Sequence, residues 1–214
     1  MQKIKDYSLY LVITEKYGKG RTAIEIARTA ITGGVDIIQM REKDMPRAEI
    51  IDLGKSLSKL CKDSGVMFIV NDDPEIAKET NADGVHLGQE DIKEHSIESV
   101  RSILGRDRII GISTHSVEVF NNACTEDVDY IAYGPVFPTA IKNSCVGIES
   151  VGKIMTMTDK PVFFIGGITL DNIRQLITKG AKNVSLIRAI AGADDIASAA
   201  KSFKMELKDA KKRA

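Results

Sequence analysis

Residues 35–43 read Val-Asp-Ile-Ile-Gln-Met-Arg-Glu-Lys, a short apolar run that ends in charged side chains. Successive side chains of a β-strand point to opposite faces, so Gln39, Arg41 and Lys43 are expected to share one face of a strand. A charge without a partner is costly in a protein interior, so both cations need solvent, an acidic partner or a negatively charged ligand. The segment alone fits a solvated strand end and an anion-binding site equally well.

Similar β-rich runs recur along the chain and alternate with segments of helical spacing. The expected strands are Leu9 to Thr14, Ile37 to Arg41, Met67 to Asn71, Gly84 to Leu87, Ile109 to Ser113, Tyr130 to Gly134, Val162 to Ile165 and Asn183 to Ile187. The expected helices include Thr22 to Thr32, Arg47 to Asp63, Ser96 to Leu104, Ile148 to Met157 and Leu170 to Lys179. This α/β alternation in 214 residues, without a linker, predicts a single (β/α)8 TIM-barrel domain over residues 1–214. A doubly wound sheet remains the alternative, because alternation does not separate the two folds.

The composition is that of a folded, soluble chain, with 43% hydrophobic and 28% charged residues. Its 30 basic and 30 acidic residues cancel, and the basic run at 201–213 is diluted by acids, which is more typical of a solvated helix face than of a nucleic-acid site. No window approaches the ~18 apolar residues that span a bilayer. We therefore expect neither a nucleic-acid nor a membrane partner.

The remaining sequence features favour a cytoplasmic location. The first eight residues are charged and lack the apolar core of a signal peptide. Cys61, Cys124 and Cys145 are widely spaced and show no metal-ligand pattern, so free thiols in a reducing compartment are expected. The sequence does not determine whether the chain forms a homo-oligomer.

In a TIM barrel the active site lies at the carboxyl ends of the strands, and this sequence concentrates polar and glycine residues there. In strand order these residues are Gln39, Arg41 and Lys43, then Asn71 and Asp72, Asp91, Ser113, Gly134 and Lys142, Gly166 and Gly167, and Arg188. The pattern predicts one site at this end of the barrel.

Acidic residues follow the third and fourth expected strands. Asp73 immediately precedes Pro74, a position typical of a helix N-cap, so Asp73 is assigned that role. Asp72 is left without a local explanation, while Asp91 taken alone would be a turn or cap residue. Mg²⁺ is commonly bound by one or two carboxylates together with water and ligand phosphates. Beside the cations of residues 39–43, the two acids favour a site for phosphate and Mg²⁺.

Two further features have both a structural and a functional interpretation. The Gly166–Gly167 pair fits a tight turn, and it also fits a phosphate site built from backbone N–H groups. The connection 134–147 is long enough to be a functional lid. Lys142 would then carry charge over the barrel mouth, or it would simply be solvated.

Three other patterns are not favoured as functional motifs. The glycines in residues 18–23 do not follow a strand directly, as a dinucleotide fingerprint requires. Ser113 with His115 lacks the second glycine of a nucleophile elbow, so Ser113 is expected to be a hydrogen-bond donor. His86 lies between two apolar residues of a strand and is expected to be a hydrogen-bonded core histidine.

From Leu9 to Ala191 the chain resembles the thiamine-phosphate synthase family of (β/α)8 enzymes. The resemblance is carried by Gln-x-Arg-Glu-Lys at residues 39–43, Asn-Asp at 71–72 and Asp-Gly-Val-His-Leu-Gly-Gln-x-Asp at 83–91. The first motif is the most specific of the three, and it is intact.

The resemblance implies a role for each matching position. The diphosphate of a hydroxymethylpyrimidine substrate would be bound by residues 39–43, which are Gln39, Met40, Arg41, Glu42 and Lys43. Asn71 and Ser113 would contact the same substrate. Asp72 and Asp91 would bind Mg²⁺, and Lys142 would contact the leaving group. The positions that match the family's binding site for the thiazole phosphate are Thr139, Ala140, Ile141, Gly167, Ile187 and Arg188. The implied catalytic residues are Arg41, Lys43, Ser113 and Lys142.

The implied reaction joins the pyrimidine diphosphate to a thiazole phosphate and expels pyrophosphate. The family is described as forming a pyrimidine carbocation that the thiazole nitrogen captures, so no protein nucleophile is needed. Cations and Mg²⁺ would stabilise the charge that develops on the diphosphate.

Two departures from the family pattern fall on the thiazole-phosphate side. The family's Thr-x-Thr-Lys is Thr139, Ala140, Ile141 and Lys142 here, and its Ile-Ser is Ile187 and Arg188. Loss of a hydroxyl partner weakens phosphate binding by about 1 kcal/mol, whereas an arginine can make a charged bidentate contact. We hypothesise that Arg188 compensates. The alternatives are a thiazole tautomerase-like relative and a non-catalytic phosphate-binding paralogue.

Overall fold

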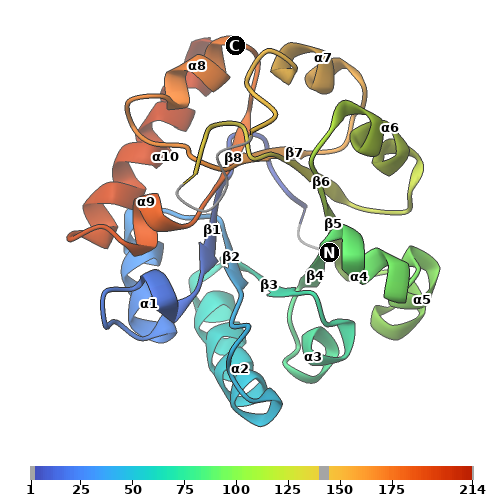
Figure 1. Ribbon diagram of the computed structural model, residues 1–214. Coiled ribbons are helices and arrows are strands. Elements are labelled where there is room, and N and C mark those ends of the chain that lie inside the picture. The colour runs from blue at the N-terminus through green and yellow to red at the C-terminus, as the bar shows by residue number, and fades with distance from the viewer. Residues whose placement is uncertain (1–2, 140–144, 214) are drawn as a thin grey trace.

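Eight parallel strands close into a barrel in the order β1-β2-β3-β4-β5-β6-β7-β8 (Figure 1). The structure is a computed structural model that describes residues 3–139 and 145–213. The strands are β1 (Leu9–Ile13), β2 (Ile37–Met40), β3 (Met67–Asn71), β4 (Gly84–Leu87), β5 (Ile109–Thr114), β6 (Tyr130–Tyr133), β7 (Val162–Ile165) and β8 (Asn183–Leu186). Leu11 of β1 pairs with Ile38 of β2 and with Leu186 of β8, which closes the sheet. The predicted TIM barrel is confirmed, and the doubly wound alternative is wrong.

Helices surround the barrel as an outer ring (Figure 1). They are α1 (Ala23–Gly33), α2 (Arg47–Ser64), α3 (Pro74–Glu79), α4 (Gln89–Glu94), α5 (Ile97–Leu104), α6 (Val117–Thr125), α7 (Val151–Thr156), α8 (Ile173–Thr178), α9 (Arg188–Ala191) and α10 (Ile196–Arg213), with a 3-10 turn η1 (Glu15–Tyr17) after β1. Helices α7 and α8 begin later than expected. Before α8, the Asn172 side chain accepts the Thr169 N–H at 2.8 Å and holds a turn.

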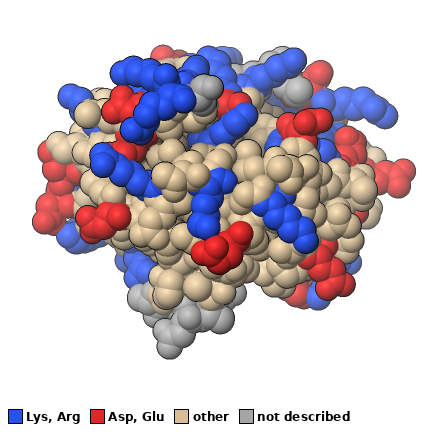
Figure 2. All heavy atoms as spheres, turned by 90° about the horizontal axis from the view of Figure 1, so that it is seen from above, with Lys and Arg blue, Asp and Glu red and all other residues tan. Residues whose placement is uncertain are grey.

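The basic C-terminal run lies on α10, where Lys201, Lys208 and Lys211 are exposed. Seen from the side of α7 and α8, Lys and Arg gather along the upper edge of the molecule with acidic residues among them (Figure 2). The exposure of Lys201, Lys208 and Lys211 agrees with the predicted solvated helix face. Among the described helices, none is long and apolar enough to cross a membrane.

Aromatic side chains fill the inside of the barrel. Tyr10, Tyr130 and Phe163 meet there, with Phe163 5.2 Å from Tyr10 and 5.4 Å from Tyr130 between ring centroids. Gly111 on β5 leaves room for one of these rings, because a Cβ at that position would lie 2.0 Å from Cζ of Tyr130. The inside of the barrel is therefore packed, and a ligand can enter only at an end.

Side chains at the amino ends of alternate strands fix the sheet register. The side-chain oxygen of a residue at the start of an even-numbered strand accepts a backbone N–H near the start of an odd-numbered neighbour. The pairs are Asp36 with Leu9 at 2.7 Å, Asp83 with Phe68 at 2.8 Å, Asp129 with Ile110 at 2.8 Å and Asn183 with Ser8 at 2.9 Å. Polar residues at this end thus stabilise the barrel, as is usual for the face opposite the active site.

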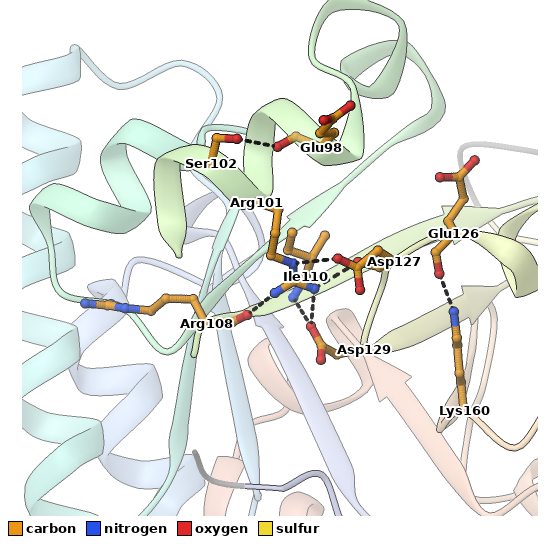
Figure 3. Close-up of polar contacts among 9 residues, drawn as sticks. All are labelled: Glu98, Arg101, Ser102, Arg108, Ile110, Glu126, Asp127, Asp129 and Lys160. Atoms are coloured by element: carbon orange, nitrogen blue, oxygen red, sulfur yellow. Dashed lines mark hydrogen bonds and ion pairs between the residues drawn. The ribbon is translucent and has the colours of Figure 1, made fainter. Parts of the chain in front are cut away.

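Arg101 of α5 reinforces one of these contacts (Figure 3). Its guanidinium donates to the Arg108 carbonyl at 2.5 Å, to the Asp127 carbonyl at 2.8 Å and to the Asp129 carboxylate at 2.9 Å. The side chain is only 11% exposed. One cation therefore joins α5 to the starts of β5 and β6.

Replacement of this cation tests the role of the amino-end contacts. Arg101→Ala leaves the half-buried Asp129 carboxylate without its cation, so we expect the free energy of unfolding to fall by about 3 kcal/mol. Urea denaturation measures the loss. Arg106→Ala removes an exposed arginine from the loop between α5 and β5, and it should change the free energy of unfolding by less than about 0.5 kcal/mol. Equal losses of stability in the two variants would contradict the stabilising role of Arg101.

Candidate active site

The carboxyl end of β2 combines a buried amide with two cations. Gln39 is 3% exposed, and its Nε2 has no hydrogen-bond partner among the described residues. Arg41 is half-buried and Lys43 is exposed. Both cations line a cavity of about 600 Å³, together with Tyr17 from the loop after β1. β2 ends at Met40, and Glu42 lines the same cavity as the two cations, so the strand alternation predicted for Gln39, Arg41 and Lys43 does not extend past residue 40.

Glu42, between the two cations, holds the loop after β1. Its carboxylate accepts the Glu15 N–H at 2.7 Å and the Thr14 hydroxyl at 3.3 Å. Burial raises the pKa of Glu42, and the Glu15 N–H opposes that shift. Because Glu15 begins the turn that ends at Tyr17, Glu42 helps to position the aromatic wall of the cavity.

The three consecutive residues at the end of β3 have different partners. Asp73 caps α3 by accepting the Ile76 N–H at 2.9 Å, and it pairs with Arg47 at 2.5 Å, so its predicted capping role is confirmed. Asp72 has a φ of +67°, a left-handed conformation that is strained for most residues other than glycine. Asn71 is half-buried beside it.

The carboxyl groups of Asp72 and Asp91 meet at the barrel mouth. Burial raises the pKa of Asp72, the neighbouring Asp91 carboxyl raises it further, and Lys43, whose Nζ is 3.4 Å from Asp72 Oδ2, lowers it. Asp91 Oδ2 also accepts the Gly88 N–H at 2.7 Å, so the capping interpretation of Asp91 holds as well. Two adjoining carboxylates repel unless a proton or a cation lies between them.

This donor set fits a hard divalent cation. No group of three or more His, Cys, Asp or Glu residues within the described part of the chain could hold a metal. Two carboxylates alone suit Mg²⁺, which usually keeps several waters and takes further oxygens from a phosphate ligand. The exposed Lys43 and half-buried Arg41 stand where such a phosphate would need counter-charges.

Ser113 lies near the end of β5 and is half-buried. Its Oγ is 2.8 Å from Nε2 of His86, and its carbonyl accepts the Gln89 side-chain N–H at 2.6 Å. His86 is buried, and Nδ1 of its ring is 2.9 Å from the Tyr130 hydroxyl. Burial lowers the pKa of His86 to about 4. His86 is therefore the hydrogen-bonded core histidine that the sequence predicted.

The glycines after β7 support the connection that follows β6. Gly166 and Gly167 have φ values of +100° and +65°, and a Cβ on Gly167 would lie 2.5 Å from the Pro138 carbonyl oxygen. The Phe137 N–H donates to the Gly166 carbonyl at 3.1 Å. The tight-turn interpretation of the glycine pair is thus correct. The phosphate contact of Gly167 stays a prediction. Thr139 follows this connection and is half-buried.

Three predicted site residues of the same connection cannot be placed. Ala140, Ile141 and Lys142 lie outside the described residues, and so does the central part of the predicted lid.

Arg188 begins α9 directly after Ile187, and its side chain is exposed at the mouth. Its guanidinium carbon is 5.5 Å from the ring centroid of Tyr17, which itself lines the cavity. A cation over an aromatic ring is weakly attracted to it and can still bind an anion. The structure therefore brings Arg188, after β8, into contact with Tyr17, after β1, which itself lines the cavity.

Sequence reasoning missed Tyr17 and Gln89, which contact predicted site residues. Both follow the end of a strand, so a search of all strand ends for aromatic and amide side chains would have found them. Their roles depend on neighbours far away in the chain, which no local pattern shows.

A family model, two curated relatives and a solved structure, all similar to this chain, name one family. The family model described as thiamine monophosphate synthase matches residues 9–190. The thiamine-phosphate synthase of Moorella thermoacetica is 39% identical over 92% of this chain and 94% of the relative, and that of Shouchella clausii is 36% identical over 97% and 99%. The solved thiamine phosphate pyrophosphorylase of Pyrococcus furiosus superposes with a TM-score of 0.87 at 33% identity, over 95% of this chain and 96% of that one.

The unpartnered amide of Gln39 gives a prediction about stability. Gln39→Met removes a buried donor that has no partner among the described residues, so we expect the free energy of unfolding to rise by about 1 kcal/mol. Gln89→Met is the matched control. It removes an amide that does donate, to the Ser113 carbonyl, and should lower stability by about 1 kcal/mol. Thermal and urea unfolding measure the stability of both variants. If Gln39→Met is less stable than Gln89→Met, the Gln39 amide has a hydrogen-bond partner and the prediction is wrong.

Proposed function

The chain belongs to the thiamine monophosphate synthase family, and we propose that it catalyses the reaction of that family. It is a transferase that joins hydroxymethylpyrimidine diphosphate to hydroxyethylthiazole phosphate, giving thiamine phosphate and pyrophosphate. The observation that carries the proposal is the contact of Lys43 with Asp72, 3.4 Å apart, beside Asp91. It joins the cations after β2 to the acids after β3 and β4 in one site.

The pyrimidine diphosphate would lie across the ends of β2 and β5. Arg41 and Lys43 bind its phosphates, while Asn71 and Ser113 contact the same substrate. Gln39 Nε2, which is buried without a partner among the described residues, would gain one from an acceptor atom of the pyrimidine. Cleavage of the C–O bond leaves negative charge on the diphosphate, and cations already in place stabilise that charge by several kcal/mol.

Asp72 and Asp91 would hold Mg²⁺ at the same end of the barrel. The bound ion would offset charge on the diphosphate leaving group. Lys43 then has two functions, since it lowers the pKa of Asp72 and carries a positive charge to the ligand. Lys142 is proposed as a further contact of the leaving group, in keeping with its match to the family motif.

The thiazole phosphate would bind near the seam between β8 and β1. Gly167, Ile187 and Arg188 are the candidates there, with Thr139, Ala140 and Ile141 from the connection after β6. Arg188 supplies the charge that replaces the lost hydroxyls, and Tyr17 supports its guanidinium. We propose an indirect contribution for Glu42 and Met40, because Glu42 holds the loop after β1 and Met40 is buried.

The Ser113–His86 contact does not favour a hydrolase. The other nitrogen of the His86 ring faces the Tyr130 phenol, whereas a serine hydrolase uses a carboxylate to orient its base. A histidine whose pKa is lowered to about 4 by burial is also a poor base. Ser113 is therefore assigned to substrate binding, and the reaction uses no protein nucleophile.

We also propose that the enzyme works in the cytoplasm, on small-molecule substrates alone. The support is chemical: Cys61, Cys124 and Cys145 are all free, which suits a reducing compartment.

The proposed reaction is tested with both substrates and Mg²⁺. The purified protein should release thiamine phosphate and pyrophosphate in equal amounts, and Asp72→Asn and Asp91→Asn should each lower kcat/KM at least a hundredfold by weakening Mg²⁺ binding. Asp73→Asn is the matched control, because Asp73 caps α3 and should affect stability more than turnover. Conversion of the thiazole alone would support the tautomerase. Pyrophosphate binding without product would support the binding paralogue.

The role of Arg188 is tested by separating the two substrates. Arg188→Ala should raise the KM for the thiazole phosphate about tenfold, the value of one charged contact, and leave the KM for the pyrimidine diphosphate unchanged. Arg188→Lys should recover part of the loss, because the charge remains but the bidentate geometry does not. An unchanged KM for the thiazole phosphate in Arg188→Ala would show that Arg188 does not compensate.

A further inference from the structure

A line of buried polar groups crosses the barrel beneath the candidate site. The Tyr10 hydroxyl is 2.9 Å from the Tyr130 hydroxyl, which is 2.9 Å from Nδ1 of His86. Nε2 of His86 is in turn 2.8 Å from Oγ of Ser113. The four residues come from β1, β6, β4 and β5, so barrel closure is what brings them together.

Packing holds this line in place. Tyr10, Tyr130 and His86 are 2%, 0% and 9% exposed. The His86 and Tyr130 rings are stacked, with centroids 5.5 Å apart and an angle of 24° between their planes. The hydroxyl and imidazole groups therefore have little freedom to find other partners.

The hydrogens of this line can be ordered in three ways when His86 is a neutral imidazole. In the first order, Tyr10 donates to Tyr130, Tyr130 donates to Nδ1, and Nε2–H donates to Ser113 Oγ. In the second order every donor is reversed, and Ser113 donates to Nε2. The third order keeps the His86 tautomer of the second, but Tyr10 O–H and Nδ1–H both donate to the Tyr130 oxygen.

Satisfaction of the buried donors separates the first order from the other two. Tyr130 is the one hydrogen-bond partner of the Tyr10 hydroxyl among the described residues. The second order therefore leaves the buried Tyr10 O–H with no acceptor, and the third leaves the buried Tyr130 O–H with no acceptor among the described residues. An unsatisfied buried donor is unfavourable, which excludes both orders. In the first order every buried O–H and N–H of the line donates, and the one remaining donor is the O–H of the half-buried Ser113.

We propose that Tyr10, Tyr130 and His86 form a one-way hydrogen-bond relay that keeps Ser113 a hydrogen-bond donor toward the barrel mouth. In this relay His86 carries its proton on Nε2, and the three buried residues are positioning residues. The ligand atom that meets Ser113 is then an acceptor, such as a phosphate oxygen or a ring nitrogen of the pyrimidine diphosphate. That assignment of the ligand rests on the proposed function, whereas the order of the hydrogens does not.

The order of the hydrogens is tested on the ligand-free protein by ¹⁵N NMR of labelled histidine. The chain contains 3 histidines, and His95→Gln and His115→Gln, both at exposed positions, assign the remaining signals to His86. At neutral pH the relay predicts a bare Nδ1 and a protonated Nε2. A protonated Nδ1 would overturn the proposal. This measurement needs no turnover, so it remains decisive if the proposed function fails.

The effect of the relay on catalysis is tested by a double-mutant cycle. Tyr130→Phe keeps the ring but frees the tautomer of His86, so kcat/KM for the pyrimidine diphosphate should fall about fivefold, the value of one hydrogen bond. In a Ser113→Ala background the same substitution should have no further effect, because the relay acts through Ser113. A purely structural role for Tyr130 would give the same loss in both backgrounds, and that result would contradict the relay.

Tyr133→Phe is the matched control for this cycle. It removes a hydroxyl from the same strand, but that hydroxyl lies 3.0 Å from Ser150 Oγ, outside the relay. It should leave kcat/KM unchanged in both backgrounds. If Tyr130→Phe does not fold, the NMR measurement, whose substitutions are all at the surface, still decides the proposal.

Discussion

Parallel closure of the barrel is the constraint on which the rest of this molecule depends. Because β1 pairs with both β2 and β8, the carboxyl ends of all eight strands share one rim. Lys43 thereby meets Asp72 from the next strand, and Arg188 after β8 meets Tyr17 after β1. The opposite rim has a different function, since Asp36, Asp83 and Asp129 there accept backbone N–H groups. Ligand chemistry and stability are thus divided between the two ends.

The two halves of the proposed site differ in how far this chain keeps the family pattern. On the pyrimidine-diphosphate side, the cations, the paired acids and the buried amide of Gln39 are all present. On the thiazole-phosphate side, hydroxyl-bearing positions have become Ile141 and Arg188. Arg188 lies over Tyr17, and in our proposal it gives the second half a cation in place of those hydroxyls. The same Tyr17 loop is held by Glu42, so the motif after β2 also supports the far side of the site.

Much of the fold could be predicted from the sequence, since alternation and helical spacing are local signals. The gathering of Lys43, Asp72 and Asp91 at one rim could be predicted too, because polar residues follow the carboxyl ends of the strands. Contacts between distant residues could not. Nothing near Glu42 shows that it holds Glu15, and nothing near His86 shows that its partners are Tyr130 and Ser113. The late start of α8 depends on one Asn172 hydrogen bond that overrides an otherwise regular helical spacing.

The central claim is that the cations after β2 and the acids after β3 and β4 form one diphosphate-and-metal site. Its most direct test is a crystal structure with Mn²⁺ and inorganic pyrophosphate, in which anomalous scattering locates the metal. We predict a metal about 2 Å from carboxylate oxygens of Asp72 and Asp91, with the pyrophosphate on Arg41 and Lys43. Metal or pyrophosphate bound away from these four side chains would contradict the claim.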